Sequence, residues 1–193
     1  MGLYDLPIVF SQKEEKKEVV IQLNVIDKVM PKSKDYHQIF ECELWQYPYR
    51  IAEYFNVEPF SQEHFLYLKK DLLFYKELGG DITTCSICED PWGGQTYGNS
   101  EIRYPSMIKW IKEENNFSFD YQDFDKWVSW MDSQGMARKI RLFSISPWHE
   151  GFYFYENNRL IYEKYKIGSE RFNKLWQVFL IDLYHHLKEK MVE

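Results

Sequence analysis

The chain has 193 residues, enough for one domain with a substantial core, and its 45% hydrophobic and 28% charged residues are ordinary for a globular protein. A formal net charge of -6, with no cluster of Lys and Arg among the aromatic residues, argues against a nucleic-acid partner. No apolar stretch reaches the roughly 20 residues of a membrane span, and the first ten residues lack the layout of a signal peptide. We therefore expect a cytoplasmic protein without a membrane partner, and its three cysteines to be reduced.

The aromatic content is high, at 19% of the residues, and includes 7 Trp, 15 Tyr and 14 Phe. Aromatic side chains bury large areas in protein cores, and they also provide flat surfaces on which a ligand can stack. Composition alone leaves both uses open.

The N-terminal residues differ in pattern from those that follow. Residues 18–27 alternate apolar and polar side chains from Val20 onward, which is typical of a strand with one wet face. A connector rich in Pro, Lys and Ser follows at residues 29–35. We therefore divide the chain into a β segment with its linker, residues 1–35, and a second domain, residues 36–193.

Three pairs of a strand and a helix are predicted after this boundary. The strands are expected at residues 39–47, 81–90 and 139–148, and the helices at residues 61–80, 120–135 and 169–190. Ser61, Asp120 and Ser169 are suited to cap the N-termini of the helices. Gly79 and Gly135 are suited to end the first two.

This alternation predicts an α/β fold with a parallel sheet and right-handed crossovers. No Gly-x-Gly-x-x-Gly or Walker sequence follows any predicted strand, so a nucleotide-binding doubly wound sheet is disfavoured. A barrel is the better hypothesis. In such a barrel, ligands meet the loops that follow the C-terminal ends of the strands.

Each predicted strand ends in a tryptophan that lies close to a proline and a polar group, in the stretches LWQYP, EDPWGGQ and SPWHEG. A sugar matches this pattern, because its apolar face stacks on aromatic rings while its hydroxyls need polar partners. We predict that Trp45, Trp92 and Trp148 stack on a sugar and that Asp90 and Gln95 form hydrogen bonds with it. The alternative is that the tryptophans plug the end of the barrel.

The Cys-x-x-Cys sequence at Cys85 and Cys88 suggests metal or redox chemistry at first sight. In a strand, however, residues three apart point to opposite faces and do not hold one metal ion together. Further ligands at recognisable spacing are also missing, so we predict neither a metal site nor a cofactor. Among acidic pairs, Glu89 and Asp90 have the better location, but no second carboxylate at an arguable distance completes a glycosidase pair.

Several stretches, in this order, resemble the catalytic domain of glycoside hydrolase family 123, also called domain of unknown function 4091. They are ELWQYPYRIAEYFNVEPFSQEHF, ITTCSICEDPWGGQ, YPSMIKWI, FSFDYQDFDKWV, SISPW and LWQVFLIDLYHHLKEK. The resemblance runs from about residue 20 to the C-terminus.

The resemblance implies a (β/α)8 TIM-like barrel preceded by a β-sandwich, and hydrolysis of terminal β-linked N-acetylgalactosamine with retention. In the family, the acetamido oxygen of the sugar attacks the anomeric carbon, an aspartate stabilises the oxazolinium, and an adjacent glutamate is acid and then base. This pair follows the fourth barrel strand, so we expect it beyond Glu193. On this basis residues 1–35 are a remnant of the sandwich, and residues 36–193 are the first three βα units.

Two expectations follow from the missing pair and the missing strands. The chain alone should be catalytically inactive, and its open sheet edges should favour self-association. An alternative of a different class is a non-catalytic carbohydrate-binding or interaction protein.

Overall fold

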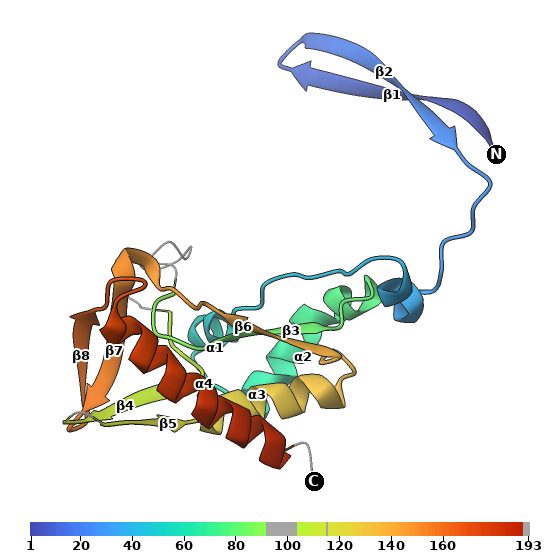
Figure 1. The fold of residues 1–193 in the computed structure, drawn as a ribbon. Coiled ribbons are helices and arrows are strands. Elements are labelled where there is room, and N and C mark those ends of the chain that lie inside the picture. The colour runs from blue at the N-terminus through green and yellow to red at the C-terminus, as the bar shows by residue number, and fades with distance from the viewer. Residues whose placement is uncertain (92–103, 115, 191–193) are drawn as a thin grey trace. The chain divides into compact units, whose positions relative to one another are not determined.

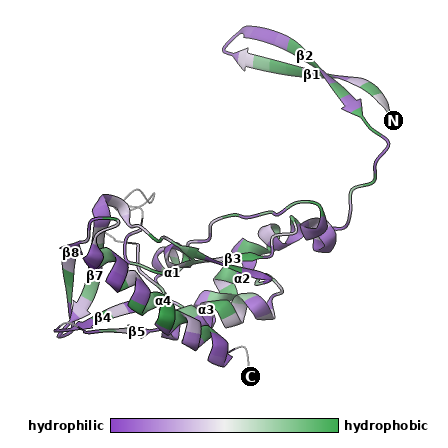
Figure 2. Cartoon of the chain, viewed as in Figure 1, coloured by the Kyte–Doolittle hydropathy of each residue, from purple (hydrophilic) through white to green (hydrophobic). Residues whose placement is uncertain are grey.

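The computed structural model describes residues 1–91, 104–114 and 116–190 of the chain (Figure 1). The described chain divides into two compact units, Met1–Lys32 and Ser33–Glu193. The first unit is an antiparallel hairpin of β1 (Gly2–Gln12) and β2 (Glu15–Val25). Leu6 pairs with Ile21 and Ile8 with Val19, so hydrophobic side chains lie opposite each other, and Figure 2 shows hydrophobic residues along both strands.

The described residues of the second unit form helices, two separate sheets and two short 3-10 turns. Its elements are η1 (Ser33–Gln38), α1 (Pro48–Phe55), α2 (Gln62–Glu77), β3 (Ile82–Ser86), β4 (Lys109–Glu113), β5 (Asn116–Asp120), α3 (Gln122–Ser133), β6 (Lys139–Phe143), η2 (Trp148–Glu150), β7 (Gly151–Glu156), β8 (Arg159–Lys164) and α4 (Glu170–Lys190).

The α/β class is confirmed, because β3 and β6 are parallel and paired from Ile82 with Lys139 to Ser86 with Phe143. The other sheet has the order β5-β4-β7-β8. In it, β4–β5 and β7–β8 are antiparallel hairpins, and one parallel pair, Ile111 with Tyr155, joins β4 to β7. Among the described residues the strands do not close into a barrel.

The three predicted helices are confirmed, and so are the predicted caps at Ser61 and Ser169. The Ser61 hydroxyl accepts a hydrogen bond from the His64 N–H at 3.2 Å, and Ser169 does the same for Phe172 at 3.2 Å. The predicted cap at Asp120 is wrong, because Tyr121 is the N-cap of α3; Asp120 ends β5 and accepts from the Gln122 N–H at 2.9 Å. α2 is followed by Gly79, which has φ +81°, and a Cβ there would lie 2.5 Å from the Ser33 carbonyl oxygen. Glycine is therefore required where η1 approaches the end of α2.

The predicted strand over residues 39–47 is wrong, because this segment forms no strand pairs in the described chain. Side-chain contacts connect this segment to β6 in place of strand pairing. The carboxylates of Glu41 and Glu43 form ion pairs with Lys139 and Arg141 of β6, and the Trp45 ring lies 5.1 Å from that of Phe143. The segment therefore runs alongside β6 in the same direction, and then enters α1, a helix that the sequence analysis missed.

Side chains also cover the edge of β3 that faces away from β6. The Gln46 amide oxygen accepts from the Thr84 N–H at 2.6 Å, and its nitrogen donates to the Ile82 carbonyl at 3.2 Å. The Tyr75 hydroxyl accepts from the Ile82 N–H at 3.1 Å, and the Trp127 indole donates to the Thr84 carbonyl at 3.1 Å. This edge has no free groups at Ile82 and Thr84 with which a second chain could pair.

Aromatic rings fill much of the core of the second unit. Trp110 lies 4.5 Å from Phe179 and 5.6 Å from Trp176, and Trp127 is fully buried in α3. Core packing therefore accounts for many of the aromatic residues. Within the described part of the chain, no helix combines the length and the apolar character that crossing a bilayer requires.

Candidate functional site

The C-terminal ends of β3 and β6 lie at one edge of their sheet, because the two strands are parallel. The Ile87 N–H donates to the Phe143 carbonyl at 2.7 Å, which continues the pairing past the last residue of β3. The Trp148 N–H donates to the Pro91 carbonyl at 3.4 Å, so the segments that follow the two strands also meet. We call residues 87–91 and 144–150 together the strand-end edge.

The structure brings three of the predicted sugar-binding residues to this region. Trp148 begins η2 on the strand-end edge and is 47% exposed. Trp45 is 63% exposed and contacts Phe143, the last residue of β6. Asp90 is half-buried and has φ +46°. The other two predicted residues, Trp92 and Gln95, lie outside the described residues.

Two tyrosines that the sequence analysis did not select lie beside Asp90. The rings of Tyr47 and Tyr104 stack at 3.5 Å between centroids with an interplanar angle of 12°, and the Asp90 N–H donates to the Tyr104 carbonyl at 2.6 Å. Burial raises the pKa of Tyr47 to about 12; Arg50 opposes this, while the charges of Glu53, Asp90 and Glu89 add to it. The Tyr47 hydroxyl is therefore protonated at neutral pH and is able to donate a hydrogen bond. The position of Tyr47 in the stretch LWQYP is the sequence signal that could have identified this tyrosine.

Glu89 is a further carboxylate at the strand-end edge, and it is only 7% exposed. Its Oε1 lies 3.5 Å from the Tyr155 hydroxyl, which donates to it from β7. Glu89 and Asp90 therefore give this edge adjacent acceptors, one buried and one half-buried. No sequence pattern could have paired Glu89 with Tyr155, because they are 66 residues apart.

The cysteine motif has a different geometry from the one predicted. β3 ends at Ser86, so Cys88 lies beyond the strand and the alternation of strand faces does not apply to it. Both thiols are buried and unpaired, and Cys88 donates to the Ser144 carbonyl at 3.4 Å. Burial raises the pKa of Cys88 to about 12 and that of Cys85 well above its usual range. Of the described residues, no three or more His, Cys, Asp or Glu are grouped so as to hold a metal ion.

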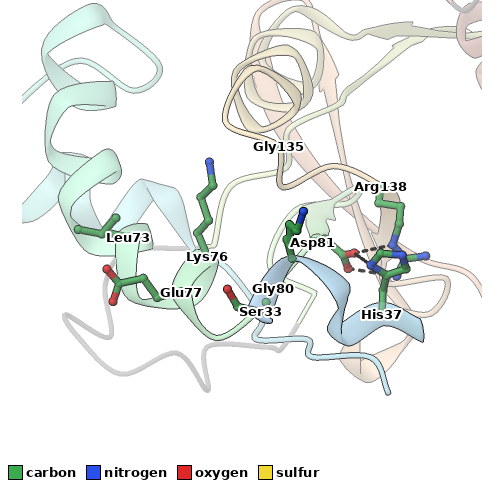
Figure 3. A pocket seen from close by; sticks show the side chains of 11 residues that line it. Ser33, His37, Leu73, Lys76, Glu77, Gly80, Asp81, Gly135 and Arg138 are labelled. Carbon is green, nitrogen blue, oxygen red and sulfur yellow. Dashed lines mark hydrogen bonds and ion pairs between the residues drawn. The ribbon is translucent and has the colours of Figure 1, made fainter. Parts of the chain in front are cut away.

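The opposite end of β3 and β6 has a cavity of about 490 Å³, lined by η1, the end of α2 and the residues just before β3 and β6 (Figure 3). The Arg138 guanidinium donates to both oxygens of Asp81, at 2.5 and 3.1 Å, and His37 lies 3.8 Å from the same carboxylate. Lys76 donates to the Gln134 carbonyl at 2.6 Å. Arg138, Asp81 and Lys76 thus connect elements of the fold, and the predicted sugar-binding residues lie elsewhere.

Comparisons with known proteins agree with the resemblance seen in the sequence. The family model described as "Glycoside hydrolase 123, catalytic domain" matches residues 45–193. A solved family 123 glycoside hydrolase from Clostridium perfringens, studied for glycolipid glycan hydrolysis, is similar with 29% identity and a TM-score of 0.76. The similarity covers 98% of this chain but 34% of that one, so the chain spans about a third of its length. No curated protein matches. The chain belongs to glycoside hydrolase family 123.

Proposed function

We propose that the strand-end edge of this chain is a sugar-binding wall of a family 123 glycoside hydrolase, and that its ligand is a glycan ending in β-linked N-acetylgalactosamine. The hydrogen bond from the Trp148 N–H to the Pro91 carbonyl carries the proposal, because it joins the loops that present Trp148 and Asp90. The solved relative is described as acting on the glycans of glycolipids, which supports a glycan as the ligand.

The residues at this edge have distinct roles in the proposal. The exposed rings of Trp45 and Trp148 stack on the apolar face of the sugar. Asp90 accepts hydrogen bonds from sugar hydroxyls or from the acetamido N–H. Trp92 and Gln95 belong to the same proposal on the sequence pattern alone.

The catalytic contribution of these residues is to orient the sugar. In a substrate-assisted reaction with retention, the acetamido oxygen must be held against the anomeric carbon, and a fixed orientation lowers the barrier. The aspartate and glutamate pair of the family has no counterpart in the motifs that match this chain. We propose that residues 36–193 are the N-terminal part of a TIM-like barrel, to which β3 and β6 contribute parallel strands, and that this chain alone binds the sugar without hydrolysing it.

The test is a calorimetric titration of the 193-residue chain with methyl β-N-acetylgalactosaminide. We expect measurable binding that becomes about tenfold weaker in Trp148→Ala, which corresponds to about 1.4 kcal/mol. Asp90→Asn should also weaken binding while keeping the backbone, because Asn tolerates positive φ. Tyr54→Ala is the matched control, because Tyr54 is an aromatic residue of α1 that is 82% exposed.

The same preparation is then assayed with an aryl N-acetylgalactosaminide, and no turnover is expected. Absence of binding by the wild-type chain would contradict the proposed wall. Turnover by a preparation free of contaminating hexosaminidase would contradict only the statement that this chain lacks catalysis.

A further inference from the structure

The sheet β5-β4-β7-β8 has two faces of different chemistry. Side chains alternate along each strand, and one face carries Trp110, Phe119 and Phe154. This face packs on α4, where Trp110 and Phe119 lie 4.5 and 5.0 Å from Phe179. The opposite face carries Lys109, Ile111, Asp120 and Tyr155, and these side chains are half-buried. The core therefore uses only one face of this sheet.

A cavity of about 840 Å³ lies on the other face, between the β4–β5 and β7–β8 hairpins. Ile111 and Tyr155, the one pair that joins the two hairpins, both line it. Asn157 and Asn158, the turn between β7 and β8, line it as well. We call this cavity the hairpin groove. Its volume lies within the range of about 300–1,000 Å³ that is usual for small-molecule sites.

The lining of the hairpin groove suits a neutral ligand with many hydroxyls. Asn157 and Asn158 offer amide donors and acceptors, and Lys109 lies 3.9 Å from Asp120. The lining has two lysines and four carboxylates, and the ammonium of Lys112 is ion-paired with Glu163 outside the lining, so the groove is acidic and disfavours an anion. No described residues form a cluster suited to a metal ion, here or elsewhere. A carbohydrate matches this mixture of an aromatic ring with charged and amide groups.

The hairpin groove adjoins the strand-end edge through one residue. Tyr155 lines the groove, and its hydroxyl lies 3.5 Å from Oε1 of Glu89. Glu89 directly precedes Asp90, the predicted hydrogen-bonding residue of the sugar wall. The hydrogen bond between Tyr155 and the buried Glu89 thus joins the lining of the groove to the strand-end edge.

We propose that the hairpin groove is a second carbohydrate subsite, which binds the sugars adjoining the terminal N-acetylgalactosamine of a neutral glycan. This inference rests on the proposed function, because it assigns the terminal sugar to the strand-end edge. Tyr155 lies where the two subsites meet, and the Asn157–Asn158 turn lies in the outer one.

The test compares two ligands, methyl β-N-acetylgalactosaminide and a neutral trisaccharide that ends in β-linked N-acetylgalactosamine. The wild-type chain should bind the trisaccharide at least about tenfold more tightly. The double variant Asn157→Gly with Asn158→Gly removes both amides but keeps the turn, because these residues have φ +50° and +60°, which glycine adopts freely. In this variant the trisaccharide should lose its advantage to within about twofold, with monosaccharide binding unchanged.

Asn56→Gly is the matched control, because Asn56 has φ +52° and lies at the end of α1, outside the groove. It should keep the full preference for the trisaccharide. Equal affinity of the wild-type chain for the two ligands would overturn the second subsite, as would a double variant that keeps the tenfold preference. A third outcome separates the two proposals: the wild-type chain binds the trisaccharide but not the monosaccharide, and the double variant binds neither. This outcome would support the groove and contradict the wall at the strand-end edge.

Discussion

The two ends of the β3–β6 pair show opposite uses of polar and aromatic side chains. At the N-terminal end, Arg138 is bound to Asp81, and Lys76 to a backbone carbonyl, so the charged groups hold the fold together. At the C-terminal end, Trp45 beside Phe143 and Trp148 beside Pro91 are exposed to solvent. The comparison agrees with a general rule of βα folds, in which loops after the strands bind ligands and the other end provides stability.

Two tryptophans make this comparison testable, and they give the largest expected effect. Trp127 is fully buried and donates to the Thr84 carbonyl, whereas Trp148 is 47% exposed. Trp127→Ala should lower the free energy of unfolding by about 3–5 kcal/mol, because it opens a cavity in the core. Trp148→Ala should change it by no more than about 0.5 kcal/mol, as is usual at the surface. Urea denaturation of both variants measures the two changes in the free energy of unfolding. Similar losses would contradict the assignment of Trp127 to the core and of Trp148 to a ligand-binding surface.

A smaller loss is expected where side chains cover the edge of β3. Gln46→Ala removes the acceptor of the Thr84 N–H, and a buried donor left without a partner costs about 1–3 kcal/mol. Gln62→Ala, at the first residue of α2, is the control for loss of a glutamine on the surface. Chemical denaturation should show a loss for Gln46→Ala alone, and an unchanged stability of that variant would mean that the amide does not support β3.

Buried thiol and phenol groups near the strand-end edge predict a gradual loss of stability in alkali. Burial raises the pKa of Cys88, Tyr47 and Tyr165 to about 12, whereas the unfolded chain releases these protons near about 8.5 for Cys and about 10 for Tyr. The folded state then holds more protons than the unfolded state, so stability falls as the pH rises from about 9 to about 12.

Cys88→Ser removes one of these titrating groups with little change in shape. The slope of unfolding free energy against pH should become shallower by about 1.4 kcal/mol per pH unit between pH 9 and 11. Denaturation midpoints across this range measure the slope. A variant with the slope of the wild-type chain would show that the Cys88 thiol titrates normally.

The elements of the fold that could be predicted from the sequence depend on residues that lie close together along the chain. Helix starts at Ser61 and Ser169 follow from a hydroxyl that bonds an amide three residues later. The segment at residues 39–47 could not be predicted correctly, because its path depends on ion pairs with residues 98 positions away. The β7–β8 hairpin had a local signal, Asn157 and Asn158 in its turn, but the sequence analysis predicted no strands in this region.

The candidate site shows the same limit. Proximity of Asp90 and Trp148 could be expected, because each follows a strand and parallel strands end together. Trp45 lies near them for a different reason, because a segment without strand pairs brings its ring to Phe143. The contribution of Tyr104 and Tyr155 could not be expected, because their contacts with Asp90 and Glu89 depend on how the loops and hairpins return to the edge.

The sugar wall is tested most directly by following the indole N–H signals of the 7 tryptophans by NMR during titration with methyl β-N-acetylgalactosaminide. Assignments come from single Trp→Phe variants. The account predicts shifts for Trp45 and Trp148, which are exposed near the strand ends, and none for Trp110, Trp127 and Trp176, which are buried in the core. Saturable binding that leaves the Trp45 and Trp148 signals unchanged would contradict the account.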